Sequence, residues 1–409
     1  MKKNVLALCA LAAAGTAAAQ SSVTMFGVVD AGISYYSVKS RSFGLTPPRE
    51  VTQSQKVLSS SGYNSSRFGF RGSEDLGGGL AASFWLEAPV ANDSGASGIA
   101  NFGRRSTVSL SGPFGEIRLG RDYTASFWND AVFDPFGVNG VGTNLIAVVN
   151  SNLAASRALA TGGVLGGGLS AGTDSYLRTS NAVSYFLPPG LGGIYGQVQY
   201  ALHENVDVST ALAGTSERGR YVGGRLGWTD SKADVALGYG ESTLVSTLPG
   251  GEKIKSLNIG GSYDFGVAKV LAEWSRVRDV RDGTATLPVR LTDRYDGLVA
   301  GVNVPVGPGV IRASLARVNF KNGNGLPDSD ASVNKLALGY VHHLSKRTAL
   351  YASVARIRVR NGHNNPTVMG VTPLVLSLPA ILPQPAYVST GGMEPRSSYG
   401  YDFGLRHAF

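Results

Sequence analysis

The sequence predicts an all-β fold: a 16-stranded antiparallel β-barrel that crosses a membrane with its strands. The first observation is composition, since 55 of the 409 residues are Gly and only 16% are charged, whereas soluble domains average roughly 25% charged residues. The second is a repeated period-2 alternation of apolar and polar residues. A mean hydropathy of +0.02 argues against a bundle of membrane helices, which would need several apolar runs of roughly 20 residues.

The N-terminus predicts export. Residues 1–19 combine a lysine-rich start, a short apolar core and a small-residue cleavage site, which is typical of a secretory signal peptide and too short for a membrane anchor. Cleavage would leave residues 20–409 as the barrel domain. It would also remove Cys9, the one cysteine of the chain, so we expect a mature protein without disulfides.

The third observation is that short turns and long connections alternate between the predicted strands. Short turns lie at 75–79, 112–115, 230–231, 305–309 and 346–347, and long connections at 37–62, 91–103, 122–178, 205–219, 243–254, 278–293, 321–332 and 361–396. Transmembrane barrels of bacterial outer membranes have this asymmetry, with short periplasmic turns and long extracellular loops. The predicted strands are 23–36, 63–74, 80–90, 104–111, 116–121, 179–186, 194–204, 220–229, 232–242, 255–265, 268–277, 294–304, 310–320, 333–345, 348–360 and 397–409.

One face of these strands is apolar and ends in aromatic residues. In the last strand Tyr401, Phe403 and Leu405 alternate with small or polar residues, as expected of a lipid-facing band with an interfacial aromatic girdle. A soluble barrel would show the reverse, with charges outside. The run 348–360 is less regular, because its arginines fall in phase with outward Leu350 and Val354, and we expect a β-bulge near Ala355 to correct the phase.

Several segments together resemble one family. The segments are 20–32, 66–80, 109–115, 119–124, 339–348 and 404–409, and they resemble Gram-negative general porins of the betaproteobacterial type. The resemblance spans essentially the whole mature chain. It implies an outer-membrane homotrimer that passes small hydrophilic solutes by passive diffusion, with the third long loop, 122–178, folded into the lumen as a constriction.

The resemblance also implies partners. The closing residues Tyr401, Phe403, Leu405 and Phe409 match the family's C-terminal assembly signature, which implies recognition by the outer-membrane barrel assembly machinery. Outer-membrane lipid, lipopolysaccharide and small solutes or anions complete the expected partners. No cofactor and no enzymatic activity are implied.

The chemistry of such a pore is electrostatic, because charged side chains at the narrowest level set the field that an ion meets. The connection 122–178 carries Asp130 and Asp134 between aromatic residues, and an inward fold would offer these acidic groups to the lumen. Strand phase turns a set of arginines inward on the opposite wall: Arg67, Arg105 and Arg178 at the constriction, with Arg71 and Arg118 near it.

We therefore expect a pore that prefers anions. Arginine suits the role because it stays charged at physiological pH, and the mature chain has a net charge of +7 once residues 1–19 are removed. The alternative is that these arginines only solvate the lumen or pair with carboxylates such as Glu74 and Glu116. The reversal potential of the channel under a salt gradient distinguishes the two.

Other functions have weaker support. The sequence holds no HExxH, GxSxG or metal-ligand spacing, although a spatial Ser–His hydrolase stays open, and its basic residues do not form the patch that binds nucleic acid. The Gly-rich stretch 162–172 lacks the Lys-Ser/Thr of a phosphate loop. A substrate-selective channel or a surface adhesin on the same barrel is the main alternative, with the long loop 361–396 and its apolar segment 371–388 as the tool.

Overall fold

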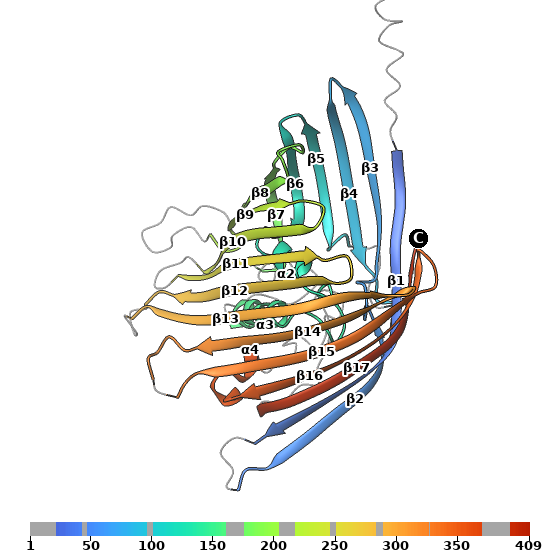
Figure 1. Cartoon of the computed structure of the whole chain (residues 1–409). Coiled ribbons are helices and arrows are strands. Elements are labelled where there is room, and N and C mark those ends of the chain that lie inside the picture. The colour runs from blue at the N-terminus through green and yellow to red at the C-terminus, as the bar shows by residue number, and fades with distance from the viewer. Residues whose placement is uncertain are drawn as a thin grey trace, which may run out of the picture.

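The computed structural model describes residues 22–42, 47–95, 101–160, 176–203, 217–245, 251–283, 289–326, 328–369 and 393–409. The strands are β1 (Ser22–Arg41), β2 (Glu50–Ser60), β3 (Arg67–Gly77), β4 (Leu80–Pro89), β5 (Arg105–Gly112), β6 (Gly115–Tyr123), β7 (Arg178–Phe186), β8 (Ile194–Ala201), β9 (Tyr221–Thr229), β10 (Ala233–Val245), β11 (Glu252–Asp264), β12 (Lys269–Arg281), β13 (Leu291–Val306), β14 (Gly309–Lys321), β15 (Ala331–His343), β16 (Thr348–Arg360) and β17 (Glu394–Ala408). The helices are α2 (Phe127–Val132), α3 (Leu145–Ala160), η2 (Gly362–Asn364) and α4 (Pro366–Met369). Figure 1 shows their arrangement.

The strands form one closed antiparallel barrel. Each strand from β3 to β17 pairs with its neighbour in sequence, and β17 pairs with β1 to close the sheet. Strands β2 and β3 occupy one position in the wall, because β2 pairs with residues 31–41 of β1 and β3 pairs with residues 22–28. The 17 strands therefore fill 16 wall positions, which confirms the predicted barrel.

The connection predicted at 37–62 is shorter than expected. β1 continues to Arg41, and β2 already begins at Glu50. The side chains of β2 are mostly exposed and polar, so this segment carries no apolar alternation. Its strand structure comes from pairing with β1, which period-2 hydrophobicity does not detect.

The two faces of the wall differ as predicted. In β17 the exposed residues Tyr399, Tyr401, Phe403 and Leu405 alternate with buried neighbours. Exposed aliphatic side chains continue around the wall, among them Val108, Leu110, Ile117, Leu119, Val198, Leu226, Leu237, Ile259, Leu298, Leu315, Leu336 and Leu338. We call this exposed apolar side the outer face and the opposite side the inner face. Lipid is the solvent that such an outer face requires.

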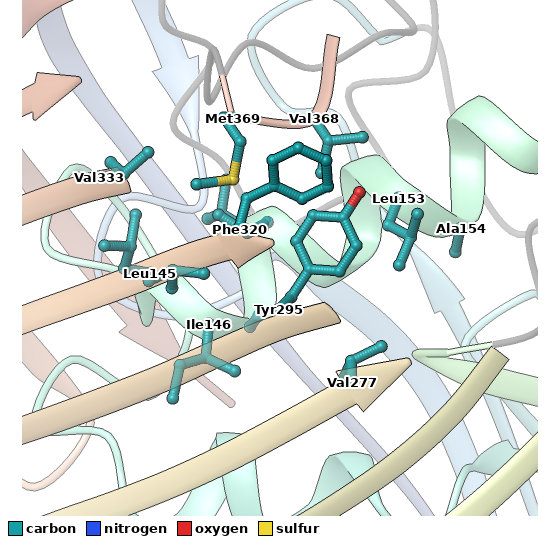
Figure 2. Close-up of a cluster of buried hydrophobic side chains, with 14 of the residues drawn as sticks. Leu145, Ile146, Leu153, Ala154, Val277, Tyr295, Phe320, Val333, Val368 and Met369 are labelled. Atoms are coloured by element: carbon teal, nitrogen blue, oxygen red, sulfur yellow. The ribbon is translucent and has the colours of Figure 1, made fainter. Parts of the chain in front are cut away.

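An apolar core lies on the inner face of β12–β16. Figure 2 shows Leu145, Ile146 and Leu153 of α3 beside Tyr295 and Phe320 of the wall, with residues of α4 completing the cluster. α3 contacts β13, β14 and α4, and α2 contacts β10 and β11. The described part of the connection 122–178 thus contains two helices that pack against the wall, whereas the sequence showed no regular structure there.

Glycines on the inner face make room for this packing. A Cβ at Gly260 would collide with the ring of Phe133, and one at Gly297 would collide with Ile146. Only glycine lets the backbone of β11 and β13 approach these side chains closely. Part of the high glycine content therefore serves the contact between the 122–178 connection and the wall.

The predicted bulge near Ala355 is wrong. The ladders of β16 with β15 and with β17 run without a register shift. Arg356, Arg358 and Arg360 are exposed on the outer face, while Ile357 and Val359 are buried in the inner core cluster. The irregular phase arose because both faces carry apolar residues where the inner face packs against α3 and α4.

Three predicted features lie outside the described residues: the signal peptide 1–19, the Gly-rich stretch 162–172 and the apolar segment 371–388. Among the described residues, no helix is both long enough and apolar enough to cross a membrane.

Candidate functional site

An arginine cluster occupies the inner face of β3–β7. We define the arginine wall as Arg67, Arg71, Arg104, Arg105, Arg118 and Arg178, together with the carboxylates Glu87, Glu116 and Asp122. Strand phase places Arg67, Arg71, Arg105 and Arg118 there as predicted, because the flanking Val108, Ile117 and Leu119 are exposed on the outer face and Phe68 lies beside the exposed ring of Phe409. Six cations therefore share three carboxylates.

Glu87 joins two arginines at one end of the wall. Its Oε1 lies 2.5 Å from Arg104 Nε and 3.9 Å from Arg67 Nε. Trp85 Nε1 donates to the other oxygen of this carboxylate at 3.2 Å. The tight Arg104 contact holds Glu87 and leaves the guanidinium of Arg67 only loosely paired.

Arg105 and Arg118 share the carboxylate of Asp122. The Nε atom of Arg105 lies 3.5 Å from Asp122 Oδ2, and Arg118 Nη1 donates to the same oxygen at 2.7 Å. Arg118 also donates twice to Glu116, at 2.8 and 3.0 Å. Arg118 is thus a fixed, doubly paired cation. The guanidinium of Arg105 instead donates to Thr107 Oγ1 at 3.1 Å and stacks 4.6 Å from the centroid of the Trp85 ring.

Arg71 has no carboxylate partner among the described residues. Its guanidinium lies 5.2 Å from the centroid of the Trp85 ring and 5.5 Å from that of Phe26, within cation–π range. It borders a hollow of about 240 Å³ lined by hydroxyl, aromatic and arginine side chains and by no carboxylate. This part of the inner wall is therefore open and positively charged.

Arg178 is buried, unlike the other predicted arginines. Only 4% of it is exposed, and its guanidinium lies 4.4 Å from the centroid of the Tyr123 ring. The ladder between β6 and β7 shifts register between Gly120 and Asp122, so the start of β7 does not keep the simple phase from which we placed this arginine. Arg178 therefore contributes positive charge to the arginine wall from a buried position.

Asp130 and Asp134 are buried in the contact between the connection and the wall. Asp130 is 0% exposed and accepts a hydrogen bond from Asn258 Nδ2 at 3.2 Å. Burial, together with the neighbouring Glu273 carboxylate, raises the pKa of Asp130 well above its usual range. Asp134 is 5% exposed and accepts the Val138 N–H at 2.8 Å, and burial raises its pKa to about 6.

The connection is anchored along the rest of the barrel by polar contacts. Asn129 donates to Asn258 on β11 at 3.0 Å, and Asn144 donates to Glu273 on β12 at 2.8 Å. Further along, Lys335 of β15 donates to the Thr143 carbonyl. The segment 124–144 thus follows the inner face of β8–β17 and leaves the arginine wall on β3–β7 uncovered.

A second anchor lies where β2 passes into β3. Asp402 of β17 accepts the Val141 N–H at 2.7 Å, and Ser65 donates to Asn139 at 2.8 Å. Asp30 of β1 holds the intervening segment 61–66, because its Oδ2 accepts the N–H groups of residues 63 and 64 at 2.8 and 2.6 Å. The interruption between β2 and β3 therefore provides an inward surface for the turn at 139–141.

Helix α3 is fixed by one arginine. Arg157 lies 2.7 Å from Asp279, 3.2 Å from Glu252 and 3.6 Å from Asp293. These carboxylates lie on β11–β13, and Asp279 is fully buried. These three carboxylates of the wall are therefore paired with an arginine of α3.

Comparisons with known proteins agree with this architecture. A sequence profile described as Gram-negative porin matches residues 5–362. The chain belongs to the Gram-negative porin family. Membership in a family of channels confirms the prediction that it is not an enzyme and places it in the outer membrane.

Two curated relatives are similar over nearly all of this porin. Outer membrane porin protein 32 of Delftia acidovorans is 34% identical over 412 residues, covering 100% of both chains. An outer membrane porin protein of Bordetella pertussis is 30% identical over 385 residues, covering 86% of this chain and 93% of the relative. Among solved structures, the anion-selective porin from Comamonas acidovorans superposes with a TM-score of 0.70 and 31% identity, covering 95% of this chain and 100% of that one.

The C-terminal residues of the porin form the seam that closes the barrel. Phe409 and Gly27 exchange two backbone hydrogen bonds of 3.1 Å. Tyr401, Phe403 and Leu405 point outward along the same strand. A role as an assembly signature stays a prediction, but these residues do lie where the first and last strands of the porin meet.

Sequence reasoning missed Arg104 and Arg225. The predicted strand 104–111 includes Arg104 and its phase turns this residue outward, whereas β5 begins only at Arg105 and Arg104 pairs with Glu87. Arg225 on β9 could have been found, because Leu226 and Trp228 are outward. Its guanidinium donates to Asn129 at 2.6 Å and to Tyr195 at 3.0 Å. Among the described residues of the porin, no group of three or more acidic, His or Cys side chains is placed to hold a metal ion.

Proposed function

We propose that this porin is a general diffusion channel for small hydrophilic solutes and that it prefers anions. The observation that carries the proposal is the arginine wall, where six arginines share three carboxylates on one side of the barrel. In a water-filled channel with low-dielectric walls, charge of one sign raises the local concentration of ions of the other sign.

The 122–178 connection is proposed to lie in the lumen and to narrow it. Support comes from its hydrogen bonds to inner-face residues of β11, β12, β15 and β17. An ion would then pass between this segment and the arginine wall. Arg67, Arg71 and Arg105 would act on it most directly, because they are the least firmly paired of the predicted arginines.

The remaining site residues take supporting roles in this proposal. Arg118 and Arg178 contribute charge from fixed or buried positions. Asp130 and Asp134 hold the connection against the wall, and the acidic groups nearest to the ion are Glu87, Glu116 and Asp122. Because Glu252, Asp279 and Asp293 on β11–β13 are paired with Arg157 and Glu273 is buried against Asn144, we expect the arginines to dominate the field in the pore.

The partners follow from the outer face and the closing strand. The exposed apolar band would contact outer-membrane lipid, and the C-terminal residues Tyr401, Phe403, Leu405 and Phe409 would be recognised by the barrel assembly machinery. We propose a homotrimer on the basis of the family resemblance. Lipopolysaccharide is proposed as the outer-leaflet lipid at the extracellular rim.

The test is the reversal potential of single channels in a planar bilayer under a tenfold KCl gradient. We expect the sign that corresponds to chloride permeating faster than potassium. The preference should weaken as salt rises toward 1 M, where the Debye length falls to roughly 3 Å. A cation-preferring wild type, or no preference at low salt, would refute the proposal.

A further inference from the structure

The outer face of β14–β16 carries five cations that the pore does not use. They are Arg317 and Lys321 on β14 and Arg356, Arg358 and Arg360 on β16, and we call them the outer basic patch. All five are exposed. None forms an ion pair within the described part of the chain, and Arg317 donates only to Asn319 at 2.9 Å.

The strand register gathers these cations into one patch. Arg317 lies opposite Asn334, which in turn lies opposite Arg358. Since adjacent strands are about 4.8 Å apart and same-face residues about 6.8 Å apart along a strand, the Cα atoms of Arg317 and Arg358 lie about 10 Å apart, and those of Lys321 and Arg360 about 12 Å apart. At such separations like charges repel unless counter-charges lie between them.

The patch lies at the edge of the lipid-facing band. One step below it on the same strands are exposed Leu315, Leu336 and Val354. The short turns of β13–β14 and β15–β16 are at the opposite ends of these strands, so the patch is on the long-loop, extracellular side. It therefore lies at the height where acyl chains give way to headgroups in the outer leaflet.

Among the described residues, the counter-charge beside the patch is Asp296 on β13, which lies opposite Asn319. Strands β14, β15 and β16 contain no Asp or Glu, and the carboxylates of β17, at Glu394 and Asp402, are buried on the inner face. On the outer face of β11–β13 most cations have a carboxylate partner, whereas exposed Arg278 has no ion pair among the described residues. Glu241 pairs with Lys253 and Lys255 at 2.8 and 2.9 Å, and Asp296 pairs with Arg276 and Arg294 at 2.6 and 2.8 Å.

We infer that the outer basic patch binds the phosphate groups of lipopolysaccharide in the outer leaflet. Guanidinium groups bind phosphate through paired, charge-assisted hydrogen bonds. The acyl chains of the same lipid would lie on the leucine band directly below, so charge and apolar surface fit one molecule. This deepens the lipid partner proposed above and rests on placement in the outer membrane, not on anion preference in the pore.

A charge-matched pair of variants tests the site. Arg356→Gln with Arg358→Gln removes two patch cations that are unpaired among the described residues, and Lys253→Gln with Arg276→Gln removes two outer-face cations that are each paired with a carboxylate. Each folded protein in detergent is titrated with purified lipopolysaccharide, and binding is followed by native electrophoresis. We expect at least about tenfold weaker binding for the patch variant, because two charge-assisted contacts are lost, and less than about a twofold change for the control.

Further arms separate the alternatives. Enzymatically dephosphorylated lipopolysaccharide should bind wild type weakly, and inorganic phosphate at equal phosphate concentration should not displace the intact lipid. Equal affinity of the patch variant and wild type would overturn the inference, as would equal binding of dephosphorylated lipid. Loss of oligomers by the patch variant with unchanged lipid affinity would assign the patch to a subunit contact instead. Channel conductance in phosphatidylcholine bilayers should not change, which keeps this test independent of the pore.

Discussion

Asp134 gives the attachment of the 122–178 connection a predictable dependence on pH. Burial raises the pKa of its carboxyl to about 6 from the ordinary value of 3.8. Below about pH 4 the group is protonated whether or not the segment is attached, so it has no effect on attachment. As pH rises from about 4 to 6, the detached form loses its proton first, and attachment weakens. Above about pH 6 the group is charged in both forms, so a further rise in pH does not weaken attachment any more.

The magnitude follows from the shift. About two pKa units at about 1.36 kcal/mol each correspond to about 3 kcal/mol at about pH 8, or roughly a hundredfold in the attachment equilibrium. Asp134→Asn keeps an oxygen for the Val138 N–H and removes the buried charge. The variant should therefore hold the segment more tightly than wild type at pH 8 and about equally at pH 4.

A cysteine at a buried position of the segment reports detachment. The mature sequence has no cysteine of its own once residues 1–19 are removed, and Val141 is 0% exposed. The assay measures the rate of thiol labelling of Val141→Cys with Asp134 present and divides it by the rate in the same protein carrying Asp134→Asn, so that ionisation of the thiol cancels. This ratio of labelling rates should be near one at about pH 4 and rise toward about a hundred at about pH 8.

A flat ratio across this pH range would refute the reasoning, and so would faster labelling of the Asn variant at pH 8. The control is Asp230→Asn, in the exposed turn between β9 and β10. Labelling of Val141→Cys should proceed at the same rate with and without this control substitution at every pH. Lys335 and Arg312 also face Asp134 and favour its charged form, so their removal should raise the midpoint.

Three further substitutions test the anchors and the seam. Lys335→Met leaves the Thr143 carbonyl without its donor, a loss of about 1–3 kcal/mol, and should increase open-channel current noise in bilayer recordings. Arg157→Gln leaves Asp279 buried with a weaker partner, a loss of up to about 3–5 kcal/mol, and should accelerate labelling of the buried cysteine reporter. Phe409→Ala removes the ring at the closing seam and should lower the fraction of heat-modifiable folded barrel in membranes, with conductance of the folded fraction unchanged.

Much of the barrel could be predicted from sequence because lipid imposes one apolar face on every strand. The alternation of the last strand, with Phe403 and Leu405 outward, is a direct consequence. β2 was missed because it is polar on both sides and owes its structure to pairing with β1. Periodicity detects burial or lipid contact and not hydrogen bonding.

The inner face was harder to predict, because what it packs against depends on distant segments. Ile357 and Val359 looked like lipid-facing residues, yet they are buried in the core around α3 and α4. That reversal led to the incorrect bulge and hid the outward direction of Arg356. Helices in the 122–178 connection acquire their apolar partners from β12–β16, which no local pattern reveals.

The candidate site was predictable in part for the same reason. Arg67 and Arg105 follow strand phase and lie on the inner wall as expected. Arg104 escaped notice because the predicted strand 104–111 turns it outward, whereas β5 begins only at Arg105. The burial of Asp130 depends on its contact with Asn258, which is far away in sequence. Strand phase predicts the direction of a side chain, whereas its contact partners can be identified only from the folded structure.

The arginine wall is the feature that we propose sets the ionic preference of the pore. The most direct test is the reversal potential of the double variant Arg67→Glu with Arg105→Glu in a tenfold KCl gradient, beside wild type and the variant Lys253→Glu with Arg276→Glu, whose positions lie away from the arginine wall. We predict that the arginine-wall variant changes to cation preference while the second variant, with the same change in net charge, keeps anion preference. Selectivity unmoved by the arginine-wall substitutions would contradict this role.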